Sequence, residues 1–247
     1  MVWCLAEVGE FAEGIVRGAE AIRIAEASDY PYCLVAVHFA AGYLYLCKGE
    51  LPQAIPMFER CLALCQALHL PNWFLAIASV LGYAYALAGR VAEAVPLLEQ
   101  AMERATSVRL VLFWASAAWL SETALLAGRL DDAIALARRA LEISRERKER
   151  GYEAWALRLL GEVAMRREPP DVDQAAGHYH QALALAEELG MRPLVAHCHL
   201  GLGTLYSKIG HVEPVRTELA AALELYRAMD MTFWLPQVEA ALVQVES

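Results

Sequence analysis

The sequence repeats with a period of about 40 residues, and this period limits the possible folds more than any other feature. A column of mostly small residues marks it, at Val2, Gly42, Gly82, Ser121, Gly161 and Gly203, with spacings of 40, 40, 39, 40 and 42 residues. Periods of this size are typical of solenoids, in which each unit buries its apolar face against the next one. We therefore expect one structural unit per period.

A second column lies seven residues after the first and is dominated by glycine. It comprises Gly9, Gly49, Gly89, Gly128 and Gly210, with Glu168 in the equivalent place of the fifth repeat. Glycine ends helices because it adopts the left-handed conformation at little cost. Each repeat is thus predicted to be a helix, a glycine turn and a second helix. The expected second helices cover residues 10–28, 51–68, 91–107, 130–149, 171–189 and 212–229.

Composition and two further columns support helices that pack closely. The chain has 45 alanines and a single asparagine, Asn72, and alanine is the best helix former. Small residues recur 12 and 19 positions after most starts of the period, as at Ala94 and Ala101. In the fifth repeat a two-residue insertion shifts them to Ala175 and Ala182, and in the sixth Val215 interrupts the first of these columns. Cys61 occupies one of these positions, which favours a structural role for its thiol. Small side chains allow the two helices of a pair to approach each other.

The predicted fold is all-α, a right-handed α-solenoid of about six helix hairpins of ~40 residues each, the first incomplete. We expect a single domain over residues 1–247. The repeats are placed near 1–30, 31–70, 71–108, 109–149, 150–191 and 192–231. Residues 232–246 should form a C-terminal capping helix, because Phe233, Trp234, Leu235, Val238, Ala241, Leu242 and Val245 follow a helical apolar spacing.

The pattern resembles the tetratricopeptide repeat. The signature of its first helix, Leu-Gly-x-x-Tyr, stands at Leu81-Gly82 with Tyr85 and again at Leu202-Gly203 with Tyr206. Phe58 fills the aromatic position of the second helix. The standard repeat has about 34 residues, so the longer period here suggests longer helices. The resemblance covers essentially the whole chain and implies a scaffold that binds a protein or peptide.

Residues 187–234 carry a narrower resemblance, in Glu187–Leu194, His199–Gly203 and Met229–Met231 with Trp234. They are similar to the C-terminal repeat regions of bacterial multidomain proteins that contain a nucleotide cyclase domain and a signal-transduction ATPase. The present chain contains no Walker A motif, the phosphate-binding loop of such ATPases. The resemblance implies a regulatory or sensor region whose partner is a protein, a peptide or a sister domain of a larger chain.

The resemblance to tetratricopeptide repeats also implies which side chains line the concave groove. The candidate binding residues are Phe39, Tyr43, Tyr83, Glu122, Trp155, Arg158, Glu162 and His197. Aromatic anchors in a concavity are what many peptide interfaces use. The alternative is structural: Tyr43 and Tyr83 would pack between repeats, and Arg158 would pair with Glu162 one helical turn away.

Catalysis is the less favoured alternative, and we expect no enzymatic activity, cofactor or metal. His178 and His180, like His197 and His199, are two residues apart, so each pair would point to different sides of a helix. Cys198 lies between two histidines in sequence, but a Cys–His dyad needs contact in space. A cross-helix histidine site in a metal-dependent enzyme stays open as a hypothesis.

Charge disfavours nucleic acid as a partner. The net charge is −9 at pH 7, whereas nucleic-acid binders use cations to displace phosphate counterions. The basic run 138–150 leaves a nucleic-acid-binding solenoid as a second alternative, although a solvated helix face is the favoured explanation of this run.

The remaining expectations concern location and assembly. The six cysteines lack metal-binding spacing and are predicted to be reduced and buried, which is consistent with a cytoplasmic protein. The uncharged stretch 61–89 is interrupted by a proline turn at 69–72, which favours two buried helices over a membrane span. Val2, Trp3 and Leu5 suggest self-association through the N-terminal end.

Overall fold

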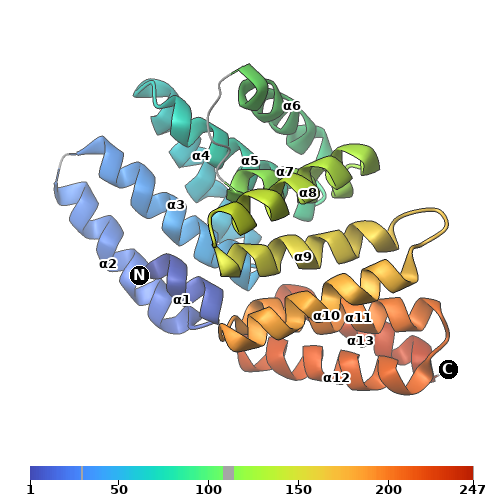
Figure 1. Ribbon diagram of the computed structural model, residues 1–247. Coiled ribbons are helices and arrows are strands. Elements are labelled where there is room, and N and C mark those ends of the chain that lie inside the picture. Colours follow the sequence, from blue (N-terminus) through green and yellow to red (C-terminus); the bar gives the residue numbers. More distant parts are fainter. Residues whose placement is uncertain (29, 108–113, 247) are drawn as a thin grey trace. The chain divides into compact units, whose positions relative to one another are not determined.

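The computed structural model describes residues 1–28, 30–107 and 114–246, and every regular element among them is a helix (Figure 1). The chain divides into two compact units, which we describe separately. Unit 1 comprises Met1–Ala6 and Glu10–Leu136, and unit 2 comprises Glu7–Gly9 and Ala137–Ser247. Within the described ranges, none of the helices combines the length and the apolar character that crossing a membrane requires. The predicted all-α class is confirmed.

The helices alternate in hairpins as expected. The first helices are α1 (Val2–Val8), α3 (Pro31–Lys48), α5 (Pro71–Leu87), α7 (Trp114–Leu126), α9 (Arg150–Met165) and α11 (Arg192–Lys208). The second helices are α2 (Phe11–Ala27), α4 (Leu51–Ala67), α6 (Val91–Ser107), α8 (Leu130–Glu146), α10 (Val172–Glu188) and α12 (Val212–Ala228). Every second helix begins within one residue of its predicted start.

The turns inside the hairpins have the predicted backbone. Gly9, Gly49, Gly89, Gly128 and Gly210 all have φ between 74° and 88°. Side chains with a Cβ atom rarely adopt this left-handed conformation, so glycine closes each helix with little strain.

The turns between hairpins use the same conformation with less favourable residues. His69, Lys148 and Asp230 have φ between 54° and 59°, and Gly190 occupies the equivalent turn with φ 68°. The chain turns through Lys148, so α8 ends at Glu146 rather than at the predicted residue 149. A lysine carries no sequence signal for a left-handed turn, which is why the prediction overran.

The small-residue columns lie in the core. Ala54, Ala94, Ala133 and Ala175 have no exposed surface, and Ala101 of α6, Ala182 of α10 and Ala222 of α12 are equally buried. Facing them, Gly42 of α3 lies against Phe58 of α4: a Cβ at Gly42 would come within 2.9 Å of the ring. The close approach predicted for the two helices of a pair is therefore present.

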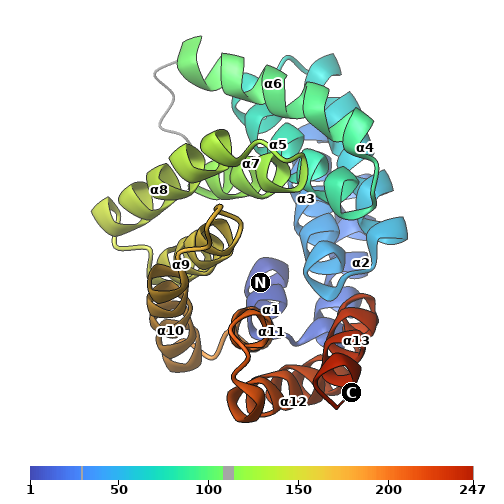
Figure 2. The ribbon, with the colours of Figure 1, turned by 90° about the vertical axis from the view of Figure 1, so that its right-hand side faces the viewer.

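Tyr179 organises the packing inside unit 2. Its ring is almost fully buried, and a Cβ at Gly161 of α9 or Gly201 of α11 would come within 3.0 Å or 2.4 Å of it. One second-helix aromatic thus fills the space that glycines open on two first helices. Figure 2 shows these hairpins, α9 with α10 and α11 with α12, and α13 beside α12.

The C-terminal helix is present but its packed face is narrower than expected. A 3₁₀ turn, η1 (Thr232–Trp234), leads into α13 (Leu235–Glu246), which packs on α12. Val238 is fully buried there. Phe233, assigned to the same apolar stripe, is 39% exposed. It lies in the 3₁₀ turn, whose side chains do not follow the α-helical spacing.

An arginine directly after the glycine turn links neighbouring hairpins twice in unit 1. Arg90 bonds Glu93 of α6 at 2.6 Å and lies 3.9 Å from Glu59 of α4. Arg129 repeats the arrangement with Asp132 of α8, at 2.7 Å, and Glu99 of α6, at 3.2 Å. In the sequence these links correspond to the pattern Gly-Arg-x-x-Glu/Asp. The columns of small residues do not reveal this pattern.

The cysteines are free thiols, as predicted, but not all are buried. Cys61 is fully buried and donates to the carbonyl oxygen of Val35 at 3.4 Å, and burial raises the pKa of its thiol to about 12. Cys4 is exposed, contrary to the expectation. Cys33 and Cys47 are only half-buried, which also differs from the expectation.

Two glycines in the same column should respond oppositely to alanine. At Gly82 a Cβ would have no neighbour closer than 3.6 Å, whereas at Gly42 it would meet Phe58 at 2.9 Å. We expect Gly82→Ala to leave stability unchanged or to raise it by up to about 1 kcal/mol through helix propensity. Gly42→Ala should lower it by about 1–3 kcal/mol through overpacking. Urea unfolding followed by circular dichroism measures both, and equal effects would contradict the packing described here.

Candidate functional site

The groove residues predicted on α3 lie inside an aromatic cluster of unit 1. The ring of Tyr43 stacks on that of Trp3, with centroids 3.9 Å apart and planes within 11°. Phe39 lies 5.7 Å from the same indole. Tyr43 is only 5% exposed and Phe39 only 7%. Their aromatic faces are therefore occupied by the protein's own side chains.

Trp119 of α7 completes this cluster. Its ring lies 5.9 Å from Tyr43, 6.0 Å from Phe39 and 6.1 Å from Trp3. Sequence reasoning did not place Trp119 or Trp3 in the groove. Trp3 follows Val2 as Tyr43 follows Gly42, so the repeat register could have identified it. Trp119 stands two residues before its column position and carried no such signal.

The two other candidates of unit 1 are more accessible. Tyr83 on α5 and Glu122 on α7 are both half-buried. Phe39 and Tyr43 thus belong to a ring cluster, and Tyr83 and Glu122 lie outside the ring contacts described for it.

Unit 2 brings its four candidates together. Trp155, Arg158 and Glu162 share one face of α9, because they are spaced by three and four residues. The Arg158 guanidinium lies 5.6 Å from the centre of the Trp155 ring and 3.3 Å from a carboxylate oxygen of Glu162. Trp155 also donates its Nε1 hydrogen to Glu7 of the same unit, at 2.9 Å. The expected pairing of Arg158 with Glu162 is present.

His197 of α11 joins this group through its ring. The imidazole lies 5.8 Å from Trp155 and 4.7 Å from Trp234. The Tyr226 hydroxyl lies 2.8 Å from Nδ1. Burial, with a further contribution from the Arg158 charge, lowers the pKa of His197 to about 3. The ring is therefore neutral at pH 7, and its Nδ1 and the Tyr226 hydroxyl share a hydrogen bond.

The remaining histidines do not gather into one site. His180 lies 3.1 Å from the hydroxyl of Tyr206, and His199 lies 2.6 Å from a carboxylate oxygen of Glu218. Among the described residues, no three His, Cys, Asp or Glu side chains are arranged to hold a metal ion. Burial raises the pKa of the Cys198 thiol to about 12, which removes the thiolate that nucleophilic catalysis needs.

Unit 2 brings an indole ring, a buried guanidinium and a carboxylate together on one face of α9. We name these four residues, Trp155, Arg158, Glu162 and His197, the α9–α11 cluster. Three of them are half-buried, and Arg158 is buried beneath them.

Truncation of Tyr43 should destabilise unit 1 rather than remove a contact to a partner. The ring is buried against Trp3 and Trp119. We expect Tyr43→Ala to cost about 3–5 kcal/mol, as for other buried aromatic residues. Chemical denaturation measures this loss. A change below about 1 kcal/mol would show that the ring cluster is loosely packed.

Acid should weaken unit 2 through His197. An unfolded histidine titrates near pH 6.5, whereas the folded ring stays neutral down to about pH 3. Between pH 6.5 and pH 3 the unfolded state binds one more proton than the folded state. The free energy of unfolding therefore decreases as the pH is lowered, by up to about 1.4 kcal/mol per pH unit. His197→Phe removes this contribution. The substitution also removes the hydrogen-bond partner of the Tyr226 hydroxyl. This loss should lower the free energy of unfolding by about 1–3 kcal/mol at pH 7.5.

The measurement is the free energy of unfolding of both proteins at pH 7.5, 6, 5 and 4.5. The variant should start less stable and show the shallower slope. Parallel curves for the two proteins would contradict a depressed pKa at His197.

Comparison with known proteins supports the repeat pattern. A family model described as tetratricopeptide repeat matches residues 33–107. A search of the curated proteins found no match. Among solved structures, BtubC (BKLC) from P. vanneervenii is 20% identical with a TM-score of 0.59, and the match covers 89% of this chain and 92% of that chain.

Two further solved structures are similar in fold. A chain of the APC/C hetero-tetramer Cut9–Hcn1 is 18% identical with a TM-score of 0.65, covering 98% of this chain and 41% of that chain. A Rap protein complexed with Competence and Sporulation Factor is 13% identical with a TM-score of 0.71, covering 96% of this chain and 68% of that chain. Residues 33–107 are therefore tetratricopeptide-repeat sequence, and the chain shares the helical-repeat fold of these structures.

Proposed function

We propose that this protein is a non-catalytic scaffold that binds a protein or peptide through the α9–α11 cluster of unit 2. The observation that carries the proposal is the convergence of Trp155, Arg158 and His197 from two helices. Tryptophan and arginine are the side chains most enriched among residues that dominate binding energy at interfaces. Their contact partners within the cluster hold them in fixed positions before a ligand arrives.

The arrangement favours a ligand with mixed character. An apolar side chain would pack on the Trp155 ring, and a polar or charged group would reach Glu162, whose carboxylate is about one third exposed. The Arg158 charge is buried and paired, so it supports the indole and the carboxylate rather than meeting the ligand first.

Solved structures of similar fold support this assignment. The Rap protein is complexed with Competence and Sporulation Factor, and Cut9 is in a complex with Hcn1. At 13–18% identity these structures share the fold alone with the present chain. A fold used in such complexes supports a protein-interaction role here.

We propose further that the scaffold belongs to a cytoplasmic bacterial signalling protein and acts as its regulatory or sensor region. The resemblance of residues 187–234 to the repeat regions of cyclase–ATPase proteins supports this assignment. We also propose self-association through the N-terminal end of the chain. Val2 and Leu5 are half-buried there and Met1 is exposed, whereas Trp3 is stacked on Tyr43.

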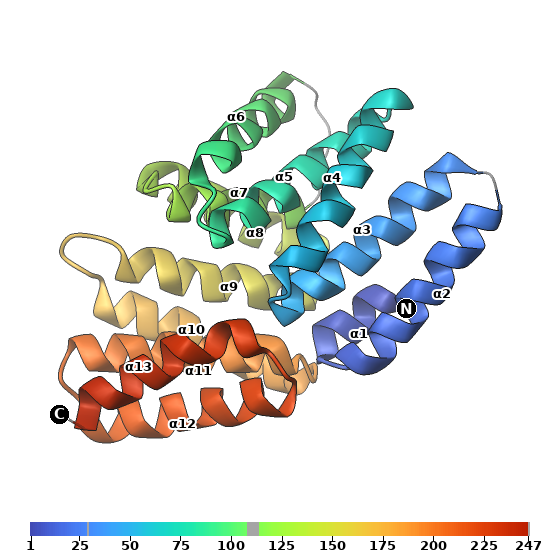
Figure 3. The same cartoon turned by 180° about the vertical axis from the view of Figure 1, so that it is seen from behind.

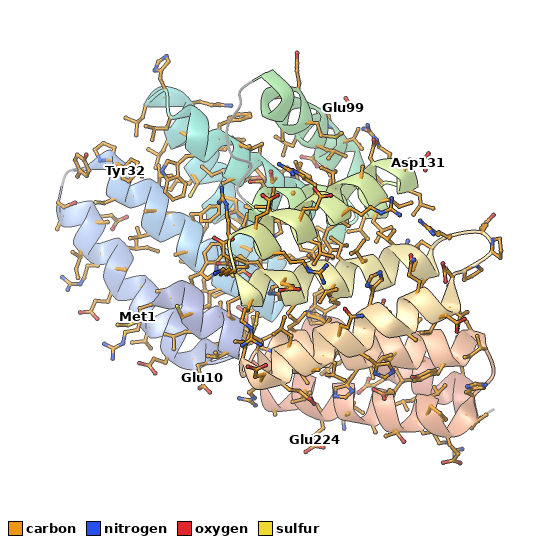
Figure 4. All side chains as sticks on the ribbon, in the orientation of Figure 1. Met1, Glu10, Tyr32, Glu99, Asp131 and Glu224 are labelled. Atoms are coloured by element: carbon orange, nitrogen blue, oxygen red, sulfur yellow. The ribbon has the colours of Figure 1, made fainter. Side chains whose placement is uncertain are left out.

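Selection from a random 15-residue peptide library displayed on phage tests the function directly. Peptides enriched on the wild-type protein should lose about 10-fold or more in affinity on Trp155→Ala, measured by fluorescence anisotropy. The matched control is Glu224→Gln, on the exposed side of α12 (Figure 4). Unfolding curves establish that both variants are folded.

Each outcome of this experiment either supports or contradicts the proposed site. Loss of binding on Trp155→Ala with retention on Glu224→Gln supports the cluster as the site. Enriched peptides that bind folded Trp155→Ala as tightly as the wild type would place the site elsewhere. A selection that enriches no peptide would count against peptide binding.

A further inference from the structure

Unit 1 has an open apolar cleft on the side of its second helices. Its lining residues belong to α4, α5 and α6. Figure 3 shows how these three helices are arranged. The cleft has a volume of about 470 Å³, within the range of roughly 300–1,000 Å³ found for binding sites. We propose that this cleft, the α4–α6 groove, docks an amphipathic helix of a partner protein that carries two aliphatic residues followed by a lysine or arginine.

Apolar side chains line most of the groove. Leu62 and Leu97 are half-buried on opposite walls, and Leu81 is buried in the floor. Ala63, Ala92 and Pro96 are exposed along the walls. These small side chains keep the groove open, so an aliphatic side chain of a partner would meet Leu62 and Leu97 without displacing a bulky residue.

The walls have the spacing that receives another helix. On α4 the lining residues Glu59, Leu62, Ala63 and Gln66 follow intervals of three and four residues, and on α6 Glu93, Pro96 and Leu97 do the same. Two such ridges with a gap between them accept the ridge of a third helix. Helix-in-groove recognition uses apolar anchors at the same intervals.

One end of the groove is acidic. Arg90 bonds Glu93 at 2.6 Å and lies 3.9 Å from Glu59, so both carboxylates gather at this end. The Tyr85 hydroxyl donates to Glu59 at 2.7 Å, and the Arg90 guanidinium covers the Tyr85 ring at 4.1 Å. Two carboxylates share one guanidinium, which leaves one negative charge in excess.

The other end has no charged lining residue. Gln66 lies seven residues after Glu59 on α4, about 10 Å further along the helix axis. A partner helix therefore gains from one cation at the Glu59–Glu93 end and from aliphatic side chains along the remainder. Charge complementarity of this kind fixes the direction in which the partner lies.

The aromatic cluster of unit 1 does not contribute to the groove. Phe39, Tyr43 and Trp119 are covered by one another and by Trp3. The α4–α6 groove uses none of these residues and none of unit 2. The proposal therefore stands or falls independently of the α9–α11 cluster.

Three synthetic 16-residue alanine-based helical peptides are the probes. All carry leucines at positions 5 and 9, and position 12 is lysine, glutamine or glutamate. Fluorescence anisotropy with the full chain should rank the peptides lysine, then glutamine, then glutamate. Each step should be about 3- to 5-fold in affinity, as for an exposed ion pair.

Two variants test where the peptides bind. Ala63→Arg places a long cation in the groove and should weaken the lysine peptide about 10-fold or more. Ala135→Arg, at an exposed alanine in the middle of α8, is the matched control and should bind as the wild type does. Trp155→Ala should also leave the affinity unchanged, which separates this site from the α9–α11 cluster.

A charge-reversal pair tests the acidic end. Glu59→Gln/Glu93→Gln leaves the Arg90 charge alone at that end, so the order of the lysine and glutamate peptides should invert. The control Glu13→Gln/Glu20→Gln removes an equal number of negative charges from α2 and should preserve the order of peptide affinities. Unfolding curves confirm that each variant is folded.

The proposal is overturned by any of four results. These are no binding of any peptide at 1 mM, equal affinity for the lysine and glutamate peptides, retained affinity in folded Ala63→Arg, and an unchanged order in the charge-reversal variant. A concentration-dependent dimer that Ala63→Arg dissociates would assign the groove to a second copy of the chain instead.

Discussion

Close contact between the two helices of each hairpin is the constraint on which the rest of the structure depends. The contact positions hold alanine or glycine without exposed surface, such as Ala94 and Ala133, and larger neighbours such as Phe58 fill the space beside them. Because interiors are packed to crystal density, a larger residue at these positions would force the helices apart. The hairpins on which the arginine links and the two proposed sites lie are held together by this contact.

Much of the fold could be predicted because its signals are local. A glycine turn requires a positive φ at one residue, and the five glycines of one column have this conformation. The end of α8 escaped prediction for the same reason, since Lys148 is left-handed without being glycine. There the surrounding packing, rather than the residue's own preference, sets the backbone conformation.

The candidate site likewise combines contacts that local sequence predicts with contacts that depend on tertiary structure. Trp155, Arg158 and Glu162 meet on one helix, so their spacing alone predicts the contact. Trp119 of α7 contacts Phe39 and Tyr43 of α3, although another first helix, α5, lies between them along the chain. This contact depends on the tertiary arrangement within unit 1. The α4–α6 groove likewise combines Leu62, Leu81 and Leu97 from three helices. A repeat register identifies equivalent positions but not which of them remain open.

The arginine links have a consequence for the mechanics of unit 1. Arg90 and Arg129 each join the second helix before the turn to the one after it, through exposed ion pairs. The apolar contacts inside a hairpin are insensitive to salt, whereas such exposed pairs are screened within a few ångströms at high ionic strength. Part of the contact between neighbouring hairpins of unit 1 is therefore sensitive to salt, whereas the apolar contact inside each hairpin is not. Because Arg90, Glu59 and Glu93 lie at one end of the α4–α6 groove, high ionic strength weakens the electrostatic link between α4 and α6 at that end.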